Sequence, residues 1–132
     1  MENLIRNPTK YTPQIIFDYQ NHHLEISGKS YPEDTSKFYA PVMASLDQYL
    51  ETLEHQDVVM NIDIKYFNSS TSKVFMDIFD ILDEEVQKGK KIVVNWCYDT
   101  EDESFLEYGE EFKEDLKHLK FNLVPKNEVS NL

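Results

Sequence analysis

The sequence predicts a two-layer α/β sandwich, in which a mixed sheet of about five strands carries its helices on one face. Apolar and polar residues alternate in the segments expected to form strands, as over 57–67, which is typical of strands with one buried face. Three other segments repeat apolar residues at spacings of three and four, the period of amphipathic helices. Right-handed crossovers between the later strands then place those strands in consecutive order across the sheet.

Length and composition predict a single domain over residues 1–132. The chain is 40% hydrophobic, which is enough for a core of its own. It has only three Gly and five Pro, and neither a repeat nor a low-complexity segment marks a linker. We expect a loose N-terminal arm over 1–13 and a frayed C-terminal tail over 125–132.

The charge of the chain restricts its partners. A formal net charge of −12 opposes binding to nucleic acid or to anionic membranes, and favours a basic surface on a protein partner. No apolar run approaches the ~20 residues of a membrane span, and the first residues do not resemble a signal peptide. Cys97 is the single cysteine and cannot form an internal disulfide. We therefore expect a cytoplasmic protein.

The N-terminal half predicts a β-hairpin followed by a helix. Segments 14–19 and 24–26 have alternating apolar residues around the turn-like 20–22, and Gly-Lys-Ser at 28–30 is expected to end the second strand. Apolar residues then recur at helical spacing up to Leu53. Because a proline kinks a helix interior, Pro41 implies that the helix begins near Tyr39 or that a short turn precedes it.

The C-terminal half alternates strands and helices. Strands are expected over 57–67, 91–98 and 121–124. A second helix is expected over 71–88, with Gly89 suited to its C′ position, and a third helix ends at about Lys117. The buried side of the central strand is expected to comprise Val58, Met60, Ile62, Ile64 and Tyr66.

Hydroxyl side chains gather where the central strand meets the second helix, in the sequence Tyr-Phe-Asn-Ser-Ser-Thr-Ser-Lys over 66–73. A helix N-terminus has unpaired N–H groups and a partial positive charge, so it stabilises a phosphate. The alternative is that these residues only cap the helix. Met76 falls outside the apolar arc of this helix, and either contacts a partner or fills the edge of the core.

Nothing in the sequence requires catalysis, a metal or a cofactor. His22 and His23 are adjacent on an expected strand and would point to opposite faces. No nucleophile elbow, P-loop or zinc-protease motif occurs. The acidic loop 99–103 has Ser104 where a calcium loop counted from Asp99 needs glycine, so its carboxylates are expected to be solvated and to favour the next helix start.

Five segments are similar, in unbroken order, to the successive motifs of the SiaC-like regulatory phosphoproteins. The resemblance extends from Ile15 to Val124, and the family resembles the STAS-domain anti-sigma-factor antagonists in fold. It implies partner switching: a serine/threonine kinase phosphorylates the protein, a PP2C-type phosphatase reverses this, and one phospho-state binds an effector. In the best-known branch the effector is a diguanylate cyclase of cyclic-di-GMP signalling. The segments are 28–34, 38–41, 66–73, 96–99 and 107–112.

The resemblance also implies the position of the modified hydroxyl. In the family this residue directly follows the Asn of the strand-to-helix motif and is usually a Thr, and here the position is Ser69. The change from Thr to Ser leaves three neighbouring hydroxyls as alternatives. The alternative to the switch is an unswitched protein-protein interaction module whose hydroxyls only cap the helix. The surface expected to contact partners comprises Asn68, Ser69, Ser70, Thr71, Ser72, Lys73 and Met76.

Overall fold

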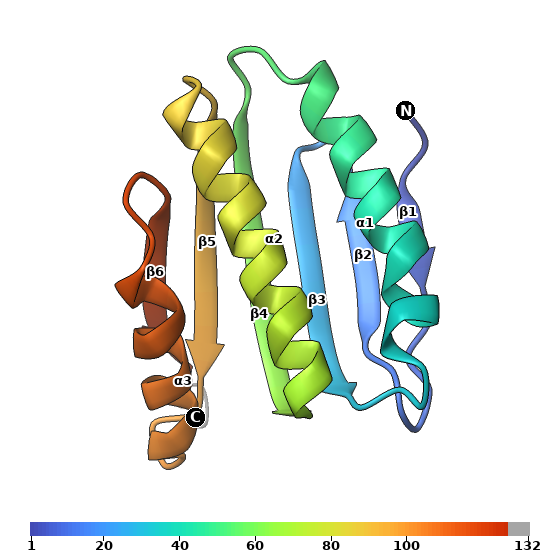
Figure 1. Cartoon of the computed structure of the whole chain (residues 1–132), viewed down its shortest axis with the longest axis vertical. Coiled ribbons are helices and arrows are strands. Elements are labelled where there is room, and N and C mark those ends of the chain that lie inside the picture. Colours follow the sequence, from blue (N-terminus) through green and yellow to red (C-terminus); the bar gives the residue numbers. More distant parts are fainter. Residues whose placement is uncertain (127–132) are drawn as a thin grey trace.

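One mixed sheet organises the protein, which we describe over residues 1–126 of a computed structural model. Its strand order, β1-β2-β3-β4-β5-β6, follows the chain. The first three strands are antiparallel neighbours, and β3 to β6 run parallel. All three helices of this part of the chain cover the same face (Figure 1). The predicted two-layer sandwich is confirmed, with one strand more than expected.

The elements lie close to their predicted positions. They are β1 (Leu4–Arg6), β2 (Gln14–Asp18), β3 (His23–Ser30), α1 (Thr35–Thr52), β4 (Asp57–Phe67), α2 (Ser69–Gln87), β5 (Lys91–Tyr98), α3 (Glu103–Glu114) and β6 (Lys120–Pro125).

The additional strand, β1, lies in the segment expected to be a loose arm. Leu4 pairs with Phe17 of β2, and the Asn3 side chain accepts a hydrogen bond of 2.9 Å from the backbone N–H of Tyr19. The expectation of a loose arm is wrong because pairing along the edge of β2 orders a segment without periodicity of its own. The expected tail begins inside β6, and residues 127–132 lie outside the described part.

A bulge at the end of β4 changes which side chains face the core. β3 continues to Ser30 instead of ending at Gly28, and the register shifts so that Lys29 pairs with Tyr66. Lys65 is therefore an extra residue in β4, and the alternation reverses after it. Tyr66 is 51% exposed, which contradicts its predicted burial, and Phe67 packs instead against Trp96.

Helix boundaries depend on polar caps that the apolar pattern does not contain. α1 begins at Thr35, because the Asp34 side chain accepts a hydrogen bond from the N–H of Lys37. The prediction of a start near Tyr39 or of a separate turn is wrong, since Pro41 lies inside a continuous helix whose inner face is buried. α3 ends at Glu114 rather than near Lys117.

The core lies between the sheet and the helices, and its C-terminal half is built around Trp96. The indole N–H of Trp96 donates to the carbonyl of Phe105 in α3 at 2.8 Å. α3 approaches this ring so closely that a Cβ on Gly109 would lie 2.6 Å from Trp96 Cδ1. This packing fixes α3 beside α2 and so shapes the surface between the two helices.

Candidate functional site

Asn68 alone caps α2. It precedes the first helical residue in an extended conformation, and its side-chain oxygen accepts from the N–H of Thr71 at 2.9 Å. α2 therefore begins at Ser69, two residues before the predicted start. Because one side chain provides the cap, the four hydroxyl groups that follow are not needed for it.

Thr71 is fully buried and belongs to a hydroxyl network. Its Oγ1 lies 2.9 Å from Ser30 Oγ and donates to the Ser30 carbonyl at 3.2 Å. Ser30 Oγ in turn lies 2.7 Å from the hydroxyl of Tyr39 in α1. Burial raises the pKa of Tyr39 to about 12, although its hydrogen bond to Ser30 lowers it. The network joins β3, α1 and the first turn of α2, and it leaves Thr71 inaccessible to a modifying enzyme.

The three serines differ in accessibility and bonding. Ser70 is exposed, but its Oγ lies 2.7 Å from Thr35 Oγ1 and donates to Asn68. Ser72 is half-buried on the side of α2 that faces α3. Ser69 is exposed at the first helical position, and within residues 1–126 its hydroxyl forms no hydrogen bond. Of the four hydroxyl residues, Ser69 is thus the one that is both exposed and without a hydrogen bond in the described part of the chain.

The start of α2 is electrostatically suited to a negative group. Its first turn contains no acidic residue. Lys73 is exposed and lies four residues after Ser69, where side chains share one face of a helix. The N-terminus itself stabilises an anion by ~0.3–1 kcal/mol.

A groove runs between α2 and α3, beginning beside Ser72. It has a volume of about 630 Å³, and apolar side chains from both helices form its floor. Met76 lines it and is 47% exposed, so this side chain lies at the surface. The apolar lining comprises Met76, Phe79, Phe112 and Leu116.

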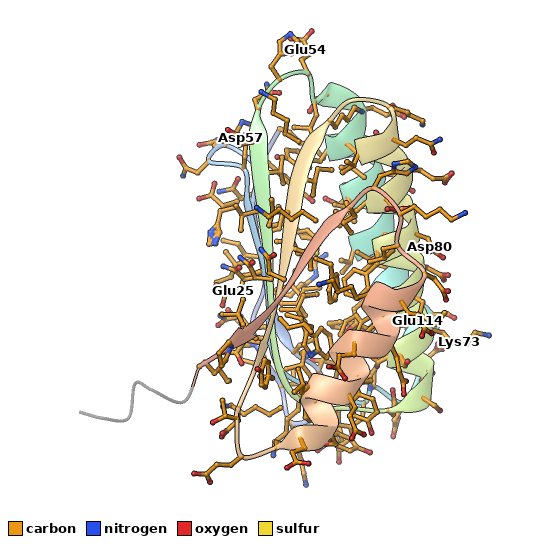
Figure 2. The ribbon with its side chains drawn as sticks, turned by 90° about the vertical axis from the view of Figure 1, so that its left-hand side faces the viewer. Glu25, Glu54, Asp57, Lys73, Asp80 and Glu114 are labelled. Carbon is orange, nitrogen blue, oxygen red and sulfur yellow. The ribbon has the colours of Figure 1, made fainter. Side chains whose placement is uncertain are left out.

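Acidic side chains surround this groove. Asp80, Glu111, Glu114 and Asp115 line it, and Figure 2 shows Asp80 and Glu114 on the helix side with Lys73. Burial and the neighbouring carboxylates, Asp77 foremost, raise the pKa of Asp80 above its ordinary value. An apolar floor with an acidic rim fits a partner segment that has apolar and basic residues.

The acidic loop and His22 both form hydrogen bonds within the fold. Asp102 of the acidic loop caps α3 by accepting from the N–H of Ser104 at 3.2 Å. His22 lies in the turn before β3 rather than on a strand, with its Nδ1 2.6 Å from the Tyr49 hydroxyl. Over residues 1–126, no group of three or more His, Cys, Asp or Glu side chains is placed so that it could hold a metal ion. No helix in the same part of the chain has the length and apolarity to cross a membrane.

Sequence reasoning missed both the buried network and the groove. The sequence places Ser30 in an expected strand end, and local spacing carries no signal of its contact with Thr71 across 41 residues. The groove depends on how closely α3 packs on Trp96, which requires the missing side chain of Gly109.

The fold is a two-layer α/β sandwich with accessible hydroxyls at a helix start beside an apolar groove. A family model described as "SiaC family regulatory phosphoprotein" matches residues 6–126. The chain therefore belongs to the SiaC family of regulatory phosphoproteins, which confirms the resemblance seen in the sequence.

Individual relatives agree with this assignment. A protein of Pseudomonas aeruginosa strain UCBPP-PA14 is 34% identical over 107 residues, covering 81% of this chain and 84% of that protein. The structure of apo-SiaC from P. aeruginosa matches with a TM-score of 0.87 and 31% identity, covering 94% of this chain and 99% of that one. A crystal structure from P. aeruginosa shows the diguanylate cyclase SiaD in complex with its activator SiaC. This chain matches it with a TM-score of 0.87 and 31% identity, covering 92% of this chain and 98% of the matched chain.

Proposed function

We propose that this protein is the switch of a bacterial partner-switching pathway, controlled by reversible phosphorylation of Ser69. A serine/threonine kinase adds the phosphate in the cytoplasm, and a PP2C-type phosphatase removes it. The observation that carries the proposal is the accessibility of Ser69: it is exposed and takes no part in capping, whereas Thr71 is buried and Ser70 is hydrogen-bonded across to α1.

The proposed effect of the phosphate is local. It adds about 1.5 to 2 negative charges and three acceptor oxygens to the start of α2. The helix end and Lys73 favour this charge, so the domain keeps its fold. A partner that buries the unmodified serine would instead meet an uncompensated charge, at a cost of several kcal/mol. The same fold thereby presents two different surfaces.

We propose a diguanylate cyclase as the effector and the α2/α3 groove as part of its docking surface. The P. aeruginosa complex of SiaC with a diguanylate cyclase supports the class of effector. The groove supports the location, because Ser72 and Met76 line it about one and two helical turns after Ser69. A partner helix with apolar residues and a basic flank would place its apolar face over Met76 and its basic residues against the acidic rim.

Phosphosite mapping tests the proposal. The protein is isolated from its native host, with and without the PP2C-type phosphatase, and analysed by mass spectrometry. We expect phosphate on Ser69 that accumulates when the phosphatase is absent. If residues 69–72 stay unmodified in both strains, the phosphorylation switch is refuted and the unswitched interaction module is the better account.

A further inference from the structure

Three tyrosines form a connected group at the strand ends next to Ser69. Tyr11 and Tyr66 are 44% and 51% exposed, and Tyr31 lies between them. The Tyr31 ring centroid is 5.3 Å from that of Tyr11 and 5.4 Å from that of Tyr66, both in edge-to-face geometry. Exposed aromatic groups of this kind are typical anchors of protein interfaces.

Backbone contacts hold these rings in place. The N–H of Tyr31 donates to the carbonyl of Tyr11 at 2.7 Å. Tyr11 lies in a turn where Thr9 Oγ1 accepts from the N–H groups of Tyr11 and Thr12. The bulge at Lys65 turns Tyr66 outward. Because these contacts restrain the backbone that carries the rings, binding through the rings costs less conformational entropy than binding through a free loop.

Lysines flank the tyrosines in a chain of net charge −12. The Lys10 ammonium lies 5.6 Å from the centre of the Tyr11 ring. Lys29 pairs with Tyr66 across the strands, and Lys65 is the bulged residue beside it. In residues 1–126 none of these lysines forms an ion pair, although Lys65 lines a hollow that also contains Asp99 and Asp102. We define the tyrosine–lysine edge as Tyr11, Tyr31, Tyr66, Lys10, Lys29 and Lys65.

This edge adjoins Ser69 but faces away from the groove. The N–H of Asn68 donates to the Ser30 carbonyl at 3.1 Å, which joins the segments that carry Tyr31 and Ser69. Ser30 and Phe67 point into the helix layer. Lys29 and Tyr66 alternate with them along the strands, so Lys29 and Tyr66 lie on the face of the sheet that carries no helices. A protein held by this edge can therefore reach Ser69 without occupying the groove.

We propose that the tyrosine–lysine edge docks an acidic segment of the kinase that phosphorylates Ser69; this inference rests on the proposed function. A kinase must hold its substrate beside the acceptor hydroxyl, and most of this chain repels an acidic surface. The edge combines aromatic anchors with lysines that form no ion pair in the described part of the chain, so it attracts and orients carboxylate-bearing segments. Substrate recognition by the kinase and effector binding are thus assigned to different faces of one domain.

Kinetics of Ser69 phosphorylation test the assignment. The full chain is incubated with the purified kinase and ATP, and initial rates are measured for wild type, Tyr66→Ala and the pair Lys29→Glu with Lys65→Glu. We expect KM to rise about tenfold or more in both variants while kcat changes less than about twofold, because the edge contributes binding and no chemistry. Lys91→Glu is the charge control, since Lys91 is exposed and begins β5 at the opposite end of the parallel strands.

The outcomes separate the two proposals. If the wild type is phosphorylated on Ser69 and the variants keep its KM, the docking edge is refuted and the switch stands. If the kinase leaves wild-type Ser69 unmodified, the proposed function fails and the docking edge fails with it. Thermal melts accompany each variant; should Tyr66→Ala melt early, the charge-reversal pair at exposed positions decides the result.

Discussion

At the scale of single residues, the first turn of α2 divides its tasks among neighbouring side chains. Asn68 caps the helix, Thr71 fixes it to β3, and Ser69 is exposed at the surface. The sequence predicted the cluster but not this division, because four adjacent hydroxyls look alike in a sequence. Their roles depend on Ser30, which lies far away in the chain.

Thr71→Val should destabilise the domain. The change keeps the shape of the side chain but removes the hydroxyl, so Ser30 and Tyr39 lose part of a buried hydrogen-bond network. We expect a loss of about 1–3 kcal/mol in the free energy of unfolding, measured with urea. Ser70→Ala is the control, expected within about 0.5 kcal/mol of wild type because Ser70 is exposed. Equal stability of Thr71→Val and wild type would show that the network contributes nothing.

At the scale of elements, one carboxylate of α2 fixes the connection from α3 to β6. Asp83 accepts hydrogen bonds from the backbone N–H groups of Lys117, His118 and Leu119, at 2.7 Å for Leu119. This contact holds the segment that follows α3, which ends at Glu114 rather than near Lys117. Burial raises the pKa of Asp83, but the hydrogen bonds from these N–H groups together have the larger, opposite effect. The pKa of Asp83 therefore lies below its ordinary value.

The Asp83 contact predicts a pH-dependent stability. A carboxyl whose folded pKa is lowered stabilises the fold above its unfolded pKa, here 3.8, and loses this contribution as the pH falls through the folded value. Asp83→Asn should therefore cost about 1–2 kcal/mol at pH 7 and progressively less below pH 3.8. Urea unfolding of both proteins across this range measures the difference. A difference that does not change with pH would contradict the assigned role.

At the scale of the whole molecule, periodicity predicted the layers and the strand order well. The alternation in the strands and the apolar stripes of the helices have the same cause, because each element buries one apolar face in the core. The exceptions are local. The edge strand β1 forms through pairing, the bulge at Lys65 reverses one alternation, and the α2/α3 groove arises from contacts between elements. The surfaces proposed for function lie at these exceptions.

The central claim is that phosphate on Ser69 changes effector binding, and calorimetry tests it most directly. The diguanylate cyclase is titrated with unmodified protein and with protein fully phosphorylated on Ser69, and Met76→Asp serves as a variant of the same groove. If the effector buries the unmodified serine, we expect phosphorylation to weaken binding at least about 100-fold, in line with several kcal/mol for a buried charge. Met76→Asp should also weaken binding while its melting temperature stays near that of wild type. Equal affinity of the two phospho-states would contradict the account.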